Sequence, residues 1–115
     1  METCYKIVDI IDGKIKTLFH GLNGSKVLPL GLWLEAEKKW VRDGTSKTWY
    51  WSGWHVTKSL QDCIDYLAKF ENVEHKAVVA CRARSIIPKA HSPSPIFLAR
   101  RIAIDRVVYR HRSSA

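Results

Sequence analysis

The stretch Lys76-Ala-Val-Val-Ala-Cys-Arg-Ala-Arg84 decides the fold class. Its β-branched and small apolar residues favour an extended strand. Because successive side chains of a strand point to opposite faces, Arg82 and Arg84 lie on one face. Val78 and Ala80 precede them on that same face. The pattern therefore predicts a strand whose apolar face ends in two neighbouring arginines.

A β-hairpin is predicted near the start of the chain. Residues 5–11 are rich in β-branched and apolar types, and Asp12-Gly13 follows them directly. Asp-Gly is a strong signal for a two-residue type I′ turn. An alternating pattern then resumes over residues 14–20. These features indicate two antiparallel strands joined by a tight turn.

The best helical pattern covers residues 59–70. Ser59 suits the N-cap position, and Asp62 stands three residues later, as in a variant of the capping box. Leu60, Ile64 and Leu67 form an apolar stripe at helical spacing. The sequence predicts one principal helix here, packed on the sheet by this stripe.

Two further segments are read as strands. Residues 27–41 are ambiguous: Leu32, Ala36 and Trp40 fit a helical stripe, while residues 33–36 also suit a short strand. We expect a short strand or turn near Leu32 and keep a helix as the alternative. Residues 48–56 form the most aromatic stretch of the chain, and this composition favours strand.

The last third of the chain is predicted to hold a loop and two short elements. Three prolines make residues 88–95 a loop that cannot pair as a central strand. A strand is expected over residues 99–104 and a short element over residues 107–110. Taken together, the patterns predict a single compact α+β domain over residues 1–115, mainly antiparallel sheet with one principal helix.

The basic charge is concentrated near the C-terminus. The formal net charge is +8. Residues 1–76 are almost neutral, whereas residues 77–115 contain Asp105 as the one acidic residue against eight basic residues, mostly arginine: Arg82, Arg84, Lys89, Arg100, Arg101, Arg106, Arg110 and Arg112. The planar guanidinium group suits phosphates and carboxylates. This face predicts a polyanion partner, nucleic acid or a ribonucleoprotein. An acidic protein surface is the alternative, and a solubility role is the third reading.

A block of aromatic residues in the middle of the chain suggests a stacking surface. Trp49, Trp51 and Trp54 lie close together in the predicted strand. Such side chains stack on nucleic-acid bases at about 1–3 kcal/mol per base. Core packing is the competing reading, since large aromatic side chains dominate core energetics.

Enzymatic and metal-binding motifs are absent from the sequence. The histidines form no metal-ligand pair, and there is no nucleophile elbow, phosphate-binding glycine loop or paired carboxylates. Cys4, Cys63 and Cys81 form an odd set without a C-x-x-C pair, so we expect three buried free thiols. No apolar run is long enough to span a membrane. We expect a cytoplasmic protein with no cofactor, no metal and no membrane partner, more a binding module than an enzyme.

A resemblance to small ADP-ribosyltransferase-like domains rests on short motifs. Leu18-Phe19-His20-Gly21 and Gly53-Trp54-His55-Val56 precede a helix that opens at Ser59 and carries Tyr66. The resemblance implies that His20 could hold a nicotinamide ribose and Tyr66 could stack on the nicotinamide, with His55 in the same pocket. The C-terminal strands contain no Glu to supply the catalytic carboxylate of that family, which favours a non-catalytic derivative.

The chain also resembles small bacteriophage accessory proteins in its compact, aromatic-rich composition. That likeness implies an accessory or host-defence-antagonist role in the host cytoplasm. The leading hypothesis from the sequence is a non-enzymatic module that binds a polyanion through its Arg-rich C-terminal face.

Overall fold

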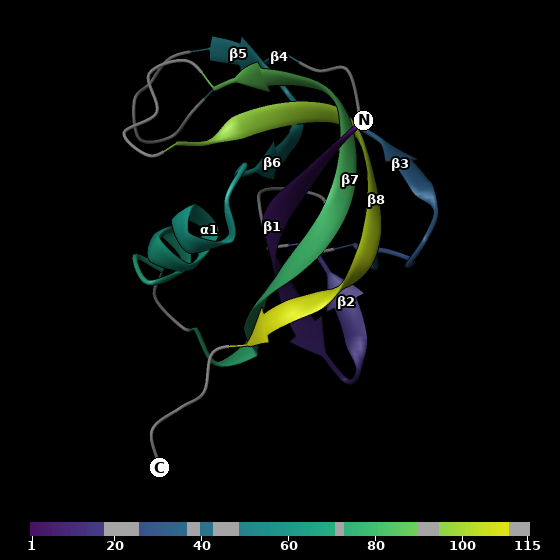
Figure 1. The fold of residues 1–115 in the computed structure, drawn as a ribbon, viewed down its shortest axis with the longest axis vertical. Helices are drawn as coiled ribbons and strands as arrows, with labels where there is room; N and C mark the ends of the chain where they lie inside the picture. The colour runs from purple at the N-terminus through teal and green to yellow at the C-terminus, as the bar shows by residue number, and fades with distance from the viewer. Residues whose placement is uncertain (18–25, 37–39, 43–48, 71–72, 90–94, 111–115) are drawn as a thin grey trace.

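The computed structural model describes residues 1–17, 26–36, 40–42, 49–70, 73–89 and 95–110. These residues form eight strands and two helical segments: β1 (Glu2–Ile11), β2 (Lys14–Lys16), β3 (Trp33–Glu35), β4 (Trp40–Arg42), β5 (Trp49–Trp51), β6 (Trp54–Val56), α1 (Leu60–Leu67), the 3₁₀ helix η2 (Val73–His75), β7 (Lys76–Pro88) and β8 (Phe97–Arg110). The two long C-terminal strands, β7 and β8, form the centre of the molecule (Figure 1).

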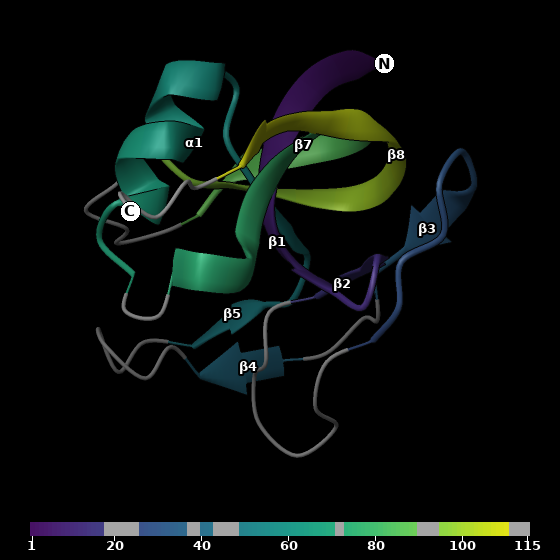
Figure 2. The ribbon, with the colours of Figure 1, turned by 90° about the horizontal axis from the view of Figure 1, so that it is seen from below.

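The main sheet is antiparallel and has the order β2-β1-β7-β8-β3. β6 also pairs with β8, on the same edge as β3. β3 pairs with residues 101–103 of β8, and β6 pairs with residues 97–99. These two short strands therefore follow one another along a single edge of β8. β4 and β5 pair with each other and lie beside the main sheet (Figure 2).

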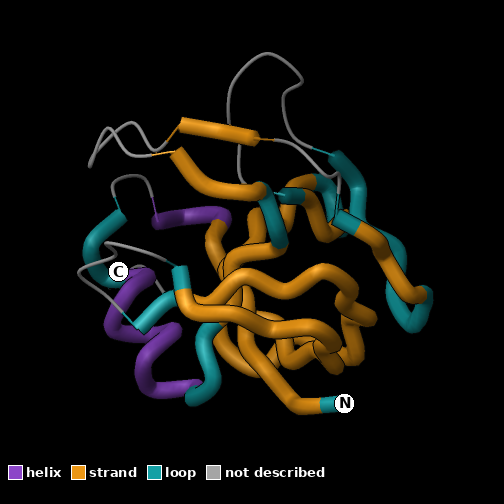
Figure 3. The backbone as a smooth tube through the Cα atoms, turned by 90° about the horizontal axis from the view of Figure 1, so that it is seen from above, coloured by secondary structure: helices purple, strands orange, loops and turns teal. Residues whose placement is uncertain are grey.

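The main sheet curls until distant strands meet. The backbone groups of Tyr5 and Thr57 exchange two hydrogen bonds, of 2.9 and 2.8 Å, which join β1 to the segment after β6. A similar bridge joins Lys16 of β2 to Val27. The curl is visible in the tube view (Figure 3). It gives the sheet an enclosed inner face and an outer face.

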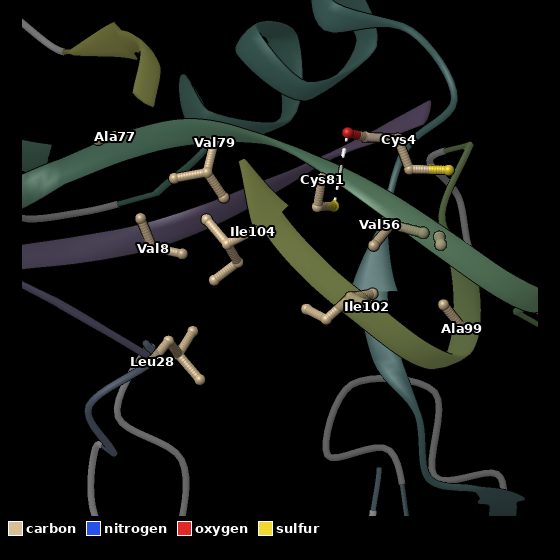
Figure 4. Packing of buried hydrophobic residues seen from close by; sticks show 11 residues of the cluster. Cys4, Val8, Leu28, Val56, Ala77, Val79, Cys81, Ala99, Ile102 and Ile104 are labelled. Carbon is tan, nitrogen blue, oxygen red and sulfur yellow. Dashed lines mark hydrogen bonds between the residues drawn. The ribbon is translucent and has the colours of Figure 1, made fainter. Parts of the chain in front are cut away.

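The inner face holds the main hydrophobic core. The side chains of Val8, Val79, Cys81, Ile102 and Ile104 are almost completely buried there, and they come from β1, β7 and β8 (Figure 4). Burial of apolar side chains of this size contributes about 1.5–3 kcal/mol each. The alternation of the strands thus places one apolar set inside the curled sheet.

The helix α1 covers one end of the outer face. The side-chain oxygen of Ser59 accepts a hydrogen bond from the Asp62 N–H at 3.0 Å, which caps the first turn. Cys63 and Leu67 then pack against Ile7 of β1 and Val78 of β7. Figures 1 and 2 show β3 at the opposite end of the sheet from α1.

An unusual backbone conformation at Ser85 changes the direction of the side chains in β7. Ser85 has φ of +56°, in the left-handed region that non-glycine residues rarely adopt. Ala83 and Ile86 both pack against the main core although they stand three positions apart, an odd spacing. Strict alternation would put them on opposite faces. The left-handed residue Ser85 lies between them, at the place where the side chains of β7 change face.

Most of the predicted elements are confirmed. The structure contains the antiparallel β1–β2 hairpin, the Ser59-capped helix, a strand next to Leu32 and the strand that begins at Lys76. β2 covers residues 14–16 of the strand predicted over residues 14–20, and residues 18–20 lie outside the described residues. The positive φ values of Asp12 (+53°) and Gly13 (+74°) fit the predicted type I′ turn. The aromatic stretch forms two short strands, β5 and β6. The predicted α+β class is confirmed in its coarse form, with the sheet dominating.

The C-terminal elements differ from the prediction. We expected two elements, over residues 99–104 and 107–110, but β8 is one strand of 14 residues. The register shifts twice against β7, so Asp105 and Val108 have no pairing partner in β7. Bulges of this kind let a strand continue past residues that interrupt its alternation. β7 also extends to Pro88, which pairs with Phe97 at the strand end, and residues 90–94 of the predicted loop lie outside the described residues.

Candidate nucleic-acid interface

Four arginines lie on the outer face of the sheet beyond the area that α1 covers. Arg82 and Arg84 stand two positions apart on β7, so they share a face, and Val78 under the helix belongs to that same face. Arg101 is the cross-strand partner of Arg84, and Arg106 is the partner of Ala80. We call Arg82, Arg84, Arg101 and Arg106 the arginine face.

Trp33 completes this surface from the neighbouring strand. It pairs with Ala103 of β8, which in turn pairs with Arg82 of β7. The guanidinium carbon of Arg84 lies 4.6 Å from the centre of the Trp33 ring, and that of Arg82 lies 5.5 Å from it. Trp33 keeps 40% of its surface exposed. A guanidinium stacked on an aromatic ring retains N–H groups at its edges that can bind phosphate oxygens.

Two carboxylates offset part of the charge. Arg82 Nε lies 3.1 Å from Asp105 Oδ1, and Arg101 lies 3.7 Å from Glu35 Oε1. Both pairs are solvent-exposed, so they contribute little to stability. Arg84 and Arg106 form no ion pair with the described part of the chain. The surface therefore keeps an excess of positive charge.

Of the other predicted basic residues, Arg100 and Arg110 lie apart from this surface. Arg100 is half-buried, and its guanidinium donates hydrogen bonds to the backbone oxygens of Ser52 at 3.3 Å and Ala36 at 3.2 Å. Arg110 is exposed at the far end of β8, opposite Ala77. The backbone N–H of Lys89 donates to Ile96 O at the loop end of the β7–β8 hairpin. Arg112 lies outside the described residues.

Trp54 is placed away from the arginine face. Its side chain is half-buried, and Nε1 donates a hydrogen bond to Leu34 O at 3.1 Å. The backbones of Trp49 and Trp51 form β5, and their side chains lie outside what the structure describes. Trp33, which the sequence reasoning did not single out, is the aromatic residue beside the arginines. The sequence does indicate that Trp33 and Glu35 share one face of a short strand, because they stand two positions apart. It does not indicate that Arg82 and Arg84 are their neighbours, because these arginines come from a distant strand.

Two of the three residues of the nucleotide pocket implied by the ADP-ribosyltransferase resemblance, His55 and Tyr66, lie in the described part of the chain. Tyr66 on α1 packs edge-on against Phe70, with ring centres 5.1 Å apart, in the hydrophobic cluster under the helix. The backbone oxygen of His55 accepts a hydrogen bond from Lys6 Nζ at 3.2 Å. His20 lies outside the described residues. Tyr66 thus has a packing role in this fold.

Lys6 is a buried amine inside the curled sheet. It is 9% exposed, shares the inner face with Cys4 and Val8, and lies 5.6 Å from the centre of the Trp54 ring. Burial lowers the pKa of Lys6 to about 8, because removal from water penalises the charged form. No carboxylate of the described residues forms an ion pair with it.

Comparison with known proteins identifies no relative: no family model, no curated protein and no solved structure matches this chain. Across the described ranges, no group of three or more His, Cys, Asp or Glu side chains is placed to hold a metal ion. None of the helices described is long and apolar enough to cross a membrane. The arginine face is therefore the candidate functional site of the described residues.

Proposed function

We propose that this protein is a non-enzymatic module that binds nucleic acid, free or within a ribonucleoprotein, through the arginine face. The observation that carries the proposal is that β7 and β8 place four arginines on one face, two of which, Arg82 and Arg84, lie over the exposed Trp33 ring. Among the described residues, Asp105 and Glu35 are the carboxylates that pair with these arginines. Phosphate contacts by arginine supply affinity that does not depend on sequence. Arg84 and Arg106, which have no carboxylate partner in the described residues, are the principal phosphate contacts in this proposal.

The cytoplasm suits this proposal. Cys4, Cys63 and Cys81 are free and buried. Unpaired thiols are typical of reducing compartments, whereas secreted domains of this size commonly carry disulfides. We therefore place the proposed binding activity in the cytoplasm.

An acidic protein surface is the second candidate partner. Leu30 and Leu32 precede Trp33 and keep 56% and 60% of their surface exposed. Exposed apolar side chains next to arginines are a common composition for protein interfaces. The same arginines would then pair with carboxylates of the partner.

Fluorescence anisotropy with labelled 20-nucleotide DNA and RNA, single-stranded and duplex, tests the proposal. We expect affinity to fall steeply between 50 and 200 mM salt, because each phosphate contact releases a counterion. Replacing Arg84 and Arg106 by Ala together removes two contacts, so the slope of log K against log salt should decrease by about 1.5. Arg110→Ala, an exposed arginine outside the arginine face, is the matched control.

Two results would overturn the proposal. One is the absence of salt-dependent binding to any of the four probes. The other is a double variant that binds like Arg110→Ala. The second candidate is supported instead under two conditions. The protein binds none of the nucleic-acid probes, and an acidic protein co-purifies with the wild-type protein, but not with the double variant, from nuclease-treated lysate.

A further inference from the structure

A pocket opens at the edge of β8 where β3 ends and β6 begins. Its volume is about 500 Å³, within the range of about 300–1,000 Å³ that is typical of small-ligand sites. Trp33 and Trp54 are its aromatic walls, and Val27, Leu28 and Leu34 add apolar surface. The polar groups at the pocket include Lys26 and Glu35. The lining is therefore mainly apolar and aromatic, with few polar groups.

The Trp54 wall is held rigidly by the surrounding residues. Its indole Nε1 donates to Leu34 O at 3.1 Å, and the buried Lys6 amine lies 5.6 Å from the ring centre. Arg100 fixes the junction between the two strands, because its guanidinium binds the backbone oxygens of Ala36 and Ser52, which both line the pocket. A site fixed in this way loses little entropy when a ligand enters.

Trp33 connects the pocket to the arginine face. It lines the pocket and also contacts the guanidinium groups of Arg84 and Arg82. Glu35 lies at the same place, but its carboxylate is 3.7 Å from the Arg101 guanidinium, which offsets its charge. An open, mainly apolar pocket and an anion-binding surface therefore share one side chain. A nucleotide combines an aromatic base with a charged phosphate, so its two parts suit these two neighbouring places.

We propose that the pocket accepts one unpaired base of a single-stranded nucleic acid whose phosphates lie on the arginine face. This inference rests on the proposed function and names its substrate class. A base in a duplex is stacked and paired, so it cannot enter a pocket without being extruded. Stacking on aromatic side chains tolerates every base, since each has a flat π-face. The protein therefore prefers single strands without reading their sequence.

The experiment compares three probes that differ in their bases. These are a 15-nucleotide oligothymidylate, an abasic oligomer of the same length and charge, and a 15-base-pair duplex, each measured by anisotropy at 50 mM salt. We expect the oligothymidylate to bind about ten-fold more tightly than the abasic oligomer. Trp33→Leu removes one aromatic wall and leaves all four arginines. It should reduce that ratio to about one, while affinity for the abasic oligomer falls by no more than about five-fold, because the cation–π contacts of the ring are lost with it.

Trp40→Leu is the matched control, because Trp40 is also exposed but does not line the pocket. Circular dichroism shows whether both variants keep the fold. Equal binding of the oligothymidylate and the abasic oligomer by the wild-type protein would overturn the inference and leave the proposed function standing. So would a Trp33→Leu variant that keeps the ten-fold ratio. Failure of all three probes to bind would overturn the proposed function together with the inference.

Discussion

The guanidinium carbon of Arg84 lies 4.6 Å from the centre of the Trp33 ring, and this contact joins β7 to β3 across β8. The contact is diagonal across the sheet. Arg84 is in register with Arg101 and Glu35, whereas Trp33 is in register with Ala103 and Arg82. The contact therefore forms only when three strands have assembled in one register. A slip of one residue would move these side chains to opposite faces.

The first prediction concerns Arg84→Lys, which keeps the charge and removes the planar group. A cation–π contact at an exposed site contributes about 0.5–1 kcal/mol. We expect nucleic-acid affinity to fall about two- to five-fold at constant salt, with an unchanged salt slope. Anisotropy titration measures both quantities, and Arg110→Lys should bind like the wild-type protein. Wild-type affinity in Arg84→Lys would show that stacking on Trp33 is unimportant.

The second prediction concerns the pH dependence that Lys6 gives to folding. The pKa of Lys6 is lowered by burial from 10.5 to about 8 in the folded protein. Below pH 8 the amine is charged in both states, and its burial carries a constant cost. Between pH 8 and 10.5 the folded state loses the proton while the unfolded state retains it. Because the unfolded state then binds more protons, this group makes stability rise with pH over that range.

Lys6→Met isolates this contribution. The buried cysteines act in the opposite direction above pH 9, since the unfolded state loses their protons first; burial, the largest cause of their raised pKa values, remains in both proteins. We expect the free energy of unfolding of Lys6→Met to exceed that of the wild-type protein by the largest amount at pH 7, where the wild-type amine is buried in its charged form. This difference from the wild-type protein should decrease by about 3 kcal/mol by pH 10.5. Urea unfolding at several pH values measures this, and a difference that stays constant would contradict the burial of Lys6.

The third prediction is that the three thiols are unreactive until the protein unfolds. Burial raises the pKa of Cys4 and of Cys63 to about 11, and that of Cys81 to about 12. The thiolate is the reactive form, so each cysteine is protected by both its pKa and its burial. Iodoacetamide at pH 8 followed by mass spectrometry should show no adduct in buffer and three in guanidinium chloride. Rapid labelling of one thiol in buffer would place that cysteine at the surface.

The fourth prediction concerns the N-cap of α1. Ser59→Ala removes the oxygen that accepts the Asp62 N–H. The free energy of unfolding should decrease by about 1 kcal/mol. Ser59→Asp retains an acceptor and should stay within about 0.5 kcal/mol of the wild-type protein, as urea unfolding can show. Equal losses in both variants would mean that the hydroxyl acts through other contacts.

Local patterns predicted the elements of this fold better than their assembly. The Asp12-Gly13 turn and the Ser59 cap depend on a few adjacent residues, so their signals are complete in the sequence. The site depends on pairing between strands that are distant in the chain. Arg100 and Arg101 look equivalent in sequence, yet one binds backbone oxygens and the other lies on the arginine face, because adjacent strand residues point in opposite directions.

Trp33 and Ser85 are two further residues whose structural role is not encoded in a short segment of sequence. The ring of Trp33 meets Arg84 only through the register of β3 and β7 on β8, which no short segment encodes. Ser85 stands in a strand pattern that gives no turn signal, yet its backbone has a left-handed φ of +56°. Sequence periodicity predicts which face a side chain occupies only while the strand remains regular.

The last prediction tests that conformation at Ser85, where φ is +56° and the side chain is exposed. A non-glycine residue in this region costs about 1–2 kcal/mol, and a β-branched residue fits it worst. Ser85→Gly removes this strain but increases the entropy of the unfolded chain, which offsets about 0.4–1 kcal/mol. We therefore expect Ser85→Gly to equal or exceed the wild-type stability, and Ser85→Val to fall below it. Since neither change alters a buried contact, urea unfolding of the two variants compares backbone conformation directly. Equal stability of the Gly and Val variants would mean that β7 is regular at this position, and the shared packing of Ala83 and Ile86 would then need another cause.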